Sequence, residues 1–198
     1  MMHCVRAVLL CFAISCEITG CVSILPPREA VGSSQLPAYH PHFELAGRIS
    51  VMTGQRGEFG QLRWICSQDK QEIALLSPLG QTVAEISQPD KQSAMLRTDT
   101  EVRSAPTFDA LVQDALGIAV PIHDIAYWIQ GVTDAQSGQA IINESDSAGR
   151  PEKLVHSGWE ISIKGYRRLD VAMIATRLHA IKGDTVVKII IDDWTALP

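Results

Sequence analysis

The chain has 198 residues, with 17 lysines and arginines against 22 aspartates and glutamates, which gives a formal net charge of −5. This length suits one globular domain, and an apolar fraction of 46% with 20% charged residues excludes a disordered chain. The acidic balance argues against a nucleic-acid-binding protein, because phosphate binding needs clustered basic residues and Arg167-Arg168 is the only adjacent basic pair.

The first twenty residues have the pattern of a bacterial export signal. Arg6 precedes an apolar run over residues 7–14, which is too short to span a bilayer but fits the apolar region of a signal peptide. The following Ile18-Thr19-Gly20-Cys21 resembles the cleavage site of bacterial lipoproteins, in which the cysteine is lipidated. We therefore expect residues 1–20 to be removed and Cys21 to carry the lipid. The alternatives are lipidation of Cys16 and an uncleaved apolar N-terminus.

Cysteine usage agrees with export and anchoring. Four of the five cysteines lie at or before the proposed cut, so the mature chain keeps only the lipidated Cys21 and Cys66. Cys66 then has no disulfide partner and is expected to be a single buried thiol. Residues 21–41 are rich in proline, glycine and serine, which predicts a flexible tether. His40 and His42 lack a third ligand at suitable spacing, so a loop is expected there rather than a metal site.

Residues 42–198 are predicted to form one domain made mainly of antiparallel strands. Apolar and polar residues alternate from Phe43 to Val51, and Arg48 belongs to the polar set. Short connections between the strands favour antiparallel pairing. Further strands are expected over residues 62–66, 72–76, 82–87, 93–98, 154–156, 160–164, 171–179 and 185–192.

Two short helices are expected between the fifth strand and the later ones. Thr107 is a suitable N-cap for the first helix, and Gly117 is a suitable end. The second is expected to open at Pro121 and to end at Gly131. Helices this short are unstable alone, so their apolar faces must lie on the sheet. The pattern predicts an α+β or barrel-like domain in which helices cover one side of an antiparallel sheet.

No known catalytic motif is present. The sequence lacks a nucleotide-binding loop, a dinucleotide fingerprint, a nucleophile elbow and a zinc-protease motif, so we expect no enzyme, cofactor or metal. Asp192 and Asp193 are neighbours in a predicted strand, where successive side chains point to opposite faces, so they are not expected to share a substrate. A catalytic triad that uses His123, His156 or His179 remains open.

Several fragments occur in the order found in a known family. Together with the cleavage site at Cys21, they resemble the LolB family of outer-membrane lipoproteins, which receive other lipoproteins from the periplasmic carrier LolA. The resemblance runs from about Cys21 to Trp194, although the tether shows no clear helix for a family-like N-terminal lid. The fragments are Phe43-Glu44-Leu45-Ala46-Gly47-Arg48-Ile49-Ser50-Val51, Trp64, Ser77-Pro78-Leu79-Gly80-Gln81-Thr82, Leu116-Gly117 with Val120-Pro121, Trp128-Ile129-Gln130-Gly131, Gly158-Trp159 with Ile161, and Ile189-Ile190-Ile191-Asp192-Asp193-Trp194.

The resemblance implies an incomplete, strongly curved antiparallel β-barrel with helices over an apolar cavity that holds acyl chains. Such chains need shelter, because each buried CH₂ contributes about 0.8 kcal/mol. Plain core packing is the alternative for every residue assigned to the cavity. The residues expected to line the cavity are Ile49, Val51, Trp64, Leu75, Ile86, Trp128 and Ile161.

The turn over residues 77–80 is predicted to contact the membrane. Its sequence fits a type I turn that leaves Leu79 at the tip, where polar residues are usual. Inserting Leu79, flanked by Pro78 and Gly80, into lipid would contribute roughly 1.5–3 kcal/mol. The alternative is that Leu79 folds back onto the sheet. We also expect Arg48 to bond carbonyls of the helical cover, with a solvated surface position as the alternative.

The leading interpretation is a monomeric, lipid-anchored acceptor on the periplasmic face of the outer membrane. It would take lipoprotein cargo from a LolA-like carrier, hold the acyl chains and insert the lipoprotein into outer-membrane lipid. Two other interpretations remain open: a structural envelope lipoprotein that binds a protein complex through its sheet edge, and a lipid hydrolase.

Overall fold

The structure, a computed structural model, describes residues 38–89, 93–117 and 119–198, and these form strands and two short helices. The export signal, Cys16, Cys21 and most of the tether lie outside the described residues. The helices are α1 (Phe108–Leu116) and α2 (Ile122–Trp128). The strands are β1 (Phe43–Thr53), β2 (Arg56–Cys66), β3 (Lys70–Leu76), β4 (Thr82–Pro89), β5 (Ala94–Thr98), β6 (Val102–Ala105), β7 (Ile141–Ser145), β8 (Pro151–His156), β9 (Trp159–Ile163), β10 (Tyr166–Leu169), β11 (Ala172–Ala175), β12 (Arg177–Lys182) and β13 (Thr185–Ala196).

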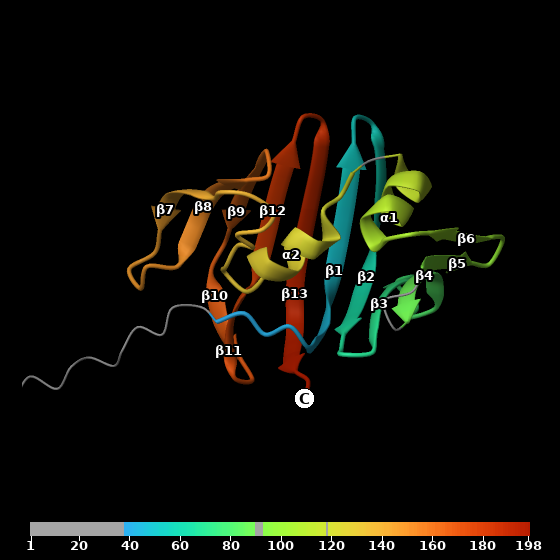
Figure 1. Cartoon of the computed structure of the whole chain (residues 1–198), viewed down its shortest axis with the longest axis horizontal. Coiled ribbons are helices and arrows are strands. Elements are labelled where there is room, and N and C mark those ends of the chain that lie inside the picture. Colours follow the sequence, from blue (N-terminus) through green and yellow to red (C-terminus); the bar gives the residue numbers. More distant parts are fainter. Residues whose placement is uncertain (1–37, 90–92, 118) are drawn as a thin grey trace, which may run out of the picture. The chain divides into compact units, whose positions relative to one another are not determined.

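Eleven of these strands form a single antiparallel sheet that does not close (Figure 1). Its order is β6-β5-β4-β3-β2-β1-β13-β12-β9-β8-β7, and β10 and β11 form a separate two-stranded ribbon. β13 pairs with β1 along its length, from Phe43 opposite Ala196 to Thr53 opposite Thr185. The predicted fold class is therefore confirmed: a mainly β domain with an incomplete antiparallel sheet and two short helices on one side.

The predicted strand boundaries needed correction in several places. Residues 171–179 were expected to form one strand, but β11 and β12 are separate, because Thr176 between them hydrogen-bonds to Gly165 and Ile191. β2 begins at Arg56 rather than residue 62. β6, β7 and β10 were not predicted, since all three are short strands without a buried apolar face.

The helix signals were more reliable at the start of α1 than at the end of α2. The Oγ1 of Thr107 accepts a hydrogen bond from the backbone N–H of Ala110, and Gly117 ends the helix in a left-handed conformation with φ of 69°. Both caps of α1 are confirmed. In contrast, α2 ends at Trp128, so the segment expected to continue as a helix to Gly131 is a turn.

Alternation along β1 divides the sheet into two faces. The inner face lies beneath the helices and carries Phe43, Leu45 and Trp64, which belong to one buried apolar cluster with Leu111 of α1 and Trp128 of α2. The cluster includes all four tryptophans of the chain. The outer face carries the alternate, more polar residues of the same strands.

A β-bulge where β1 meets β13 overturns the expectation for the paired aspartates. Gly47 lies opposite Ile191 while Ala46 lies opposite Asp193, so Asp192 is the extra residue. Both aspartates are therefore exposed, instead of facing opposite sides of the sheet. The close approach requires glycine, because a Cβ at Gly47 would overlap the carbonyl oxygen of Ile190.

Candidate functional site

The residues expected to line an acyl cavity all lie in or against the apolar cluster of the inner face. Trp64, Trp128 and Ile161 are fully buried, so in this conformation they fill the core. The other four are partly buried and pack against the same cluster: Ile49, Val51, Leu75 and Ile86. All seven residues therefore belong to or pack against one apolar cluster, and their contact with acyl chains remains a prediction.

The two helices form a cover whose parts are joined to each other. In α1, the carboxylate of Asp109 accepts a hydrogen bond from the backbone N–H of Ile122, at the start of α2, at 3.1 Å. Desolvation raises the pKa of Asp109, while the hydrogen bond from Ile122 and the nearby His123 act in the opposite direction. The link between the helices makes α1 and α2 a single covering unit, which we call the helical cover.

The α2 end of the helical cover is fixed by several buried hydrogen bonds. The indole N–H of Trp128 donates to Nδ1 of His156 at 3.1 Å, and the other ring nitrogen of His156 lies 3.2 Å from the carbonyl oxygen of Gly138. The backbone N–H of Ala175 donates to the carbonyl of Ile129. Since His156 is fully buried, this end of the cover is held tightly to the sheet.

Gln130 and Tyr127 connect the same end to the segment that precedes β1. The buried side-chain amide of Gln130 accepts a hydrogen bond from the backbone N–H of His40 and donates to its carbonyl. Tyr39 stacks on Tyr127 with ring centroids 3.8 Å apart. Residues 39 and 40, assigned to the flexible tether in the sequence prediction, therefore pack on the folded body.

The α1 end is held by a partly exposed arginine in addition to its apolar contacts. Arg103 of β6 donates from Nε to the carboxylate of Glu101 and from Nη1 to the carbonyl and carboxylate oxygens of Asp114, both at 3.4 Å. The side chain of Arg103 is 39% exposed. Exposed ion pairs contribute little to stability, so the polar contacts at this end are weaker than the buried hydrogen bonds at the α2 end.

The contact predicted between Arg48 and the helical cover is wrong. Arg48 lies on the outer face, where it forms a two-point ion pair with Asp192, with N–O distances of 2.9 and 3.2 Å. The bulge that turns Asp192 outward supplies this partner. Arg103 makes the contact with helix carbonyls that was expected of Arg48, and sequence reasoning missed it because β6 itself was not predicted.

The turn over residues 77–80 has the predicted form. The backbone N–H of Gly80 donates to the carbonyl of Ser77 at 2.8 Å, and Gln81 pairs with Ser77 to close the loop. Leu79 is 88% exposed. The alternative in which Leu79 folds back onto the sheet is therefore wrong, and contact with a membrane remains a prediction.

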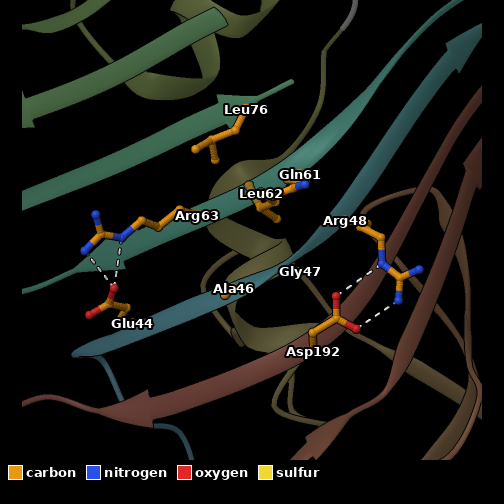
Figure 2. Close-up of a pocket in the computed structure, with 9 residues that line it drawn as sticks. All are labelled: Glu44, Ala46, Gly47, Arg48, Gln61, Leu62, Arg63, Leu76 and Asp192. Atoms are coloured by element: carbon orange, nitrogen blue, oxygen red, sulfur yellow. Dashed lines mark hydrogen bonds and ion pairs between the residues drawn. The ribbon is translucent and has the colours of Figure 1, made fainter. Parts of the chain in front are cut away.

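The outer face carries a pocket of about 490 Å³ over β1, β2 and β3 (Figure 2). Two ion pairs flank it, Arg48 with Asp192 and Arg63 with Glu44, and the small Ala46 lies between them. A second pocket of about 280 Å³ lies next to it. The second pocket is lined by Arg48, Ile49, Phe59, Gly60, Gln61 and Pro78.

The three histidines considered for catalysis have other surroundings. His123 pairs with Asp134 at 2.8 Å, His156 lies in the core, and His179 is half-buried beside Lys188. Within residues 38–89, 93–117 and 119–198, no hydrogen bond joins any of them to a serine or cysteine hydroxyl or thiol. In the same part of the chain, no group of three or more potential ligands is placed to hold a metal ion.

Two further observations concern Cys66 and the membrane. The thiol of Cys66 is half-buried and unpaired by any disulfide, and desolvation raises its pKa. Neither helix in the described part of the chain is long and apolar enough to cross a membrane.

Comparison with known proteins gives a consistent result. A family model described as "Outer membrane lipoprotein LolB" matches residues 41–194. Proteins named outer-membrane lipoprotein LolB from Azoarcus sp. (strain BH72) and Thiobacillus denitrificans are 29% and 28% identical to the chain. The Azoarcus match covers 96% of this chain and 95% of that protein, and the Thiobacillus match covers 98% and 100%. A LolA superfamily protein from Nitrosomonas europaea shares the fold, with a TM-score of 0.52, 10% identity and coverage of 83% of this chain and 90% of that protein.

Proposed function

The chain belongs to the LolB family of outer-membrane lipoproteins, and from this premise we propose that it accepts lipoproteins at the outer membrane, shelters their acyl chains beneath the helical cover and inserts them into the bilayer. The donor would be a periplasmic carrier of the LolA type. The protein itself would be held on the periplasmic face of the outer membrane by lipid on Cys21. No bond in the cargo is made or broken in this scheme.

The observation that carries this proposal is the way the helical cover lies over the inner face. It shields the buried apolar cluster, and the cluster is bounded by a sheet that does not close. The α2 end is held by buried hydrogen bonds, whereas the α1 end relies on apolar contacts and Arg103. Movement at the α1 end would therefore admit acyl chains at the lowest cost.

Partly buried residues mark where such chains would enter. Ile49 and Val51 of β1 and Leu75 of β3 already contact the cluster without being sealed by it. Acyl chains that replace water against these side chains gain about 0.8 kcal/mol per CH₂. Because two or three chains together amount to tens of kcal/mol, binding is strong without any polar contact, and release requires an equally apolar destination such as a bilayer.

Co-purification with cargo tests the proposal. The protein should retain an acylated lipoprotein and should fail to retain the same lipoprotein without its acyl groups. Equal retention of both forms would contradict the proposal and would favour the alternative of a structural lipoprotein that binds proteins. Edge strand β7 is the feature that supports this alternative, because Ile141 and Ile142 are more than half exposed on it.

A further inference from the structure

The outer face offers a groove that the acyl-binding scheme does not use. The pocket between the two ion pairs and the smaller pocket beside it share Arg48 and Gln61, so the two are adjacent, and we call them together the groove. Figure 2 shows the part between the Arg63–Glu44 and Arg48–Asp192 pairs, with Ala46 between them. The smaller pocket extends the groove to Pro78 in the exposed turn. The side-chain amide of Gln61 lies 3.5 Å from the carbonyl oxygen of Pro78 and connects the groove to that turn.

The charges along the groove are balanced. Arg63 with Glu44 and Arg48 with Asp192 are each in contact at 2.9 Å, and all four side chains are about half exposed. The groove therefore presents cationic and anionic groups side by side with no net charge from these pairs. A zwitterionic phospholipid headgroup, with one phosphate and one ammonium, has the matching arrangement, because guanidinium groups bind phosphate and carboxylates bind ammonium.

Two large apolar side chains project at the Pro78 end of the same groove. Phe59 of β2 alternates with Leu62 and Trp64 of the core, so it points to the outer face, and it is 82% exposed. Leu79, next to Pro78, is 88% exposed. These are the two most exposed large apolar residues in the described part of the chain, and they come from separate segments that meet at one pocket. Two such residues beside one pocket form a candidate interaction site.

We propose that the outer face of β1–β3 is the surface with which this domain contacts a zwitterionic phospholipid bilayer, with Phe59 inserting beside Leu79 and the two ion pairs meeting headgroups. The inference rests on the proposed function in one respect, the lipid on Cys21 that brings the bilayer within reach. About 17 residues separate Cys21 from the first described residue, and a fully extended chain of that length spans at most about 60 Å. The domain can therefore lay this face on the membrane while it remains anchored.

The orientation has a functional consequence. The helical cover lies on the inner face, and the groove lies on the opposite side of the same strands. With the outer face on the bilayer, the cover is turned away from the membrane and toward an arriving carrier. Two apolar contacts, Phe59 and Leu79, fix this orientation better than one, because a single inserted side chain leaves the domain free to rotate about it.

Spin labelling of the mature, lipidated protein in vesicles tests the proposal. Cysteine is introduced by Phe59→Cys in a Cys66→Ser background, and the matched control is Val171→Cys, which is 58% exposed in the turn of the β10–β11 ribbon. In vesicles of phosphatidylethanolamine and phosphatidylcholine, the label at residue 59 should become accessible to oxygen and protected from a water-soluble nickel complex. The label at residue 171 should stay aqueous. Adding phosphatidylglycerol should leave both results unchanged, since the groove carries no net charge.

The same site has a functional readout that is independent of acyl binding. Phe59→Glu should slow the insertion of lipoproteins into vesicles roughly tenfold, while co-purification with acylated cargo is retained. Val171→Glu should leave the insertion rate unchanged. If the wild-type protein does not bind acylated cargo, the proposed function is wrong. The label at residue 59 tests membrane contact by the outer face whichever way the cargo experiment turns out.

Two outcomes would overturn the inference. A label at residue 59 that is as aqueous as the label at residue 171 shows that the outer face does not lie on the bilayer. A label that stays aqueous in vesicles but becomes immobilised when a cargo-loaded carrier is added shows that the groove binds a protein instead. Phe59→Ser removes the aromatic side chain without adding a charge and serves as the folding control. If its circular dichroism matches that of the wild type, neither result can be attributed to misfolding caused by the loss of Phe59.

Discussion

Asp109 in α1 caps the neighbouring helix α2 by accepting a hydrogen bond from the backbone N–H of Ile122 at 3.1 Å. The residue before α2, Pro121, has no side-chain group to cap the helix. The carboxylate therefore acts as an N-cap supplied from another helix. This contact joins the start of α1 to the start of α2, while the last turn of α1 is held separately by Arg103.

Replacing Asp109 with asparagine tests the contact through its pH dependence. Desolvation raises the pKa of the Asp109 carboxyl. The pKa of aspartate in the unfolded chain is about 3.9. A carboxyl whose pKa is higher in the folded protein contributes its full stabilisation below that unfolded pKa. The stabilisation is lost as the pH rises through the pKa of the folded protein. Asp109→Asn keeps the acceptor oxygen without the charge. The variant should therefore gain stability relative to wild type as pH rises from about 4, and the difference should level off once the pH exceeds the raised pKa of Asp109 in the folded protein.

Urea unfolding of both proteins across this pH range measures the difference. Asp114→Asn is a suitable control, because it lies in the same helix with a largely exposed carboxylate. A difference between Asp109→Asn and wild type that does not change with pH would contradict the assignment.

Weakening the attachment of α1 should loosen one end of the helical cover. Arg103→Gln removes the ion pairs to Glu101 and Asp114 and most of the contact with the last turn of α1. The expected loss of global stability is small, about 1 kcal/mol or less, because these pairs are partly exposed. Amide hydrogen exchange should nevertheless become faster in α1 and stay unchanged in the buried part of α2. Arg97→Gln on the adjacent β5 is the control, and equal acceleration in both helices would be evidence against a weak α1 end.

Local sequence patterns were sufficient for the elements that depend on local chemistry. Alternation from Phe43 to Val51 identified β1, and the cap residues Thr107 and Gly117 set the bounds of α1. The turn that exposes Leu79 also followed from its residues, because serine, proline and glycine occupy positions that favour a type I turn. Each of these features is decided by residues close together in the chain.

Features that depend on distant partners could not be predicted in the same way. The partner of Arg48 is Asp192, which faces outward because of a bulge opposite Gly47. Neither the bulge nor the pairing of β1 with β13 is visible in local periodicity. Likewise, Phe59 lies among polar residues and glycines at the start of β2, where no alternation of apolar and polar residues is visible. Its outward position follows only from the register of the whole strand.

His156 has a structural role that a substitution can measure. It was one of three histidines considered for catalysis, but it accepts a hydrogen bond from the buried indole N–H of Trp128. His156→Phe should leave that donor without a partner, at a cost of roughly 1–3 kcal/mol. The midpoint of thermal unfolding should fall by several degrees, given about 2–4 °C per kcal/mol for a domain of this size. His156→Gln should recover part of the loss, because an amide can accept and donate.

Circular dichroism melting curves provide the measurement, with His179→Phe as the control, since His179 is half-buried and lies outside the core network. The assignment is wrong if His156→Phe melts at the wild-type temperature. A loss of lipoprotein delivery without any loss of stability would instead revive a chemical role for this histidine.

The exposed turn provides the most direct test of membrane contact. Leu79 is 88% exposed, so Leu79→Glu should leave the free energy of unfolding unchanged. A glutamate at the tip forfeits the roughly 1.5–3 kcal/mol expected from inserting leucine into lipid and adds the cost of bringing a charge to the bilayer. Delivery of lipoproteins to vesicles should therefore slow by about tenfold or more.

Val102→Glu, at an exposed apolar position on β6, is the control and should deliver lipoproteins at the wild-type rate. If Leu79→Glu folds normally and delivers lipoproteins at the wild-type rate, then the turn does not contact the membrane during release, because a charge at the tip of an inserted loop is incompatible with an undisturbed insertion step.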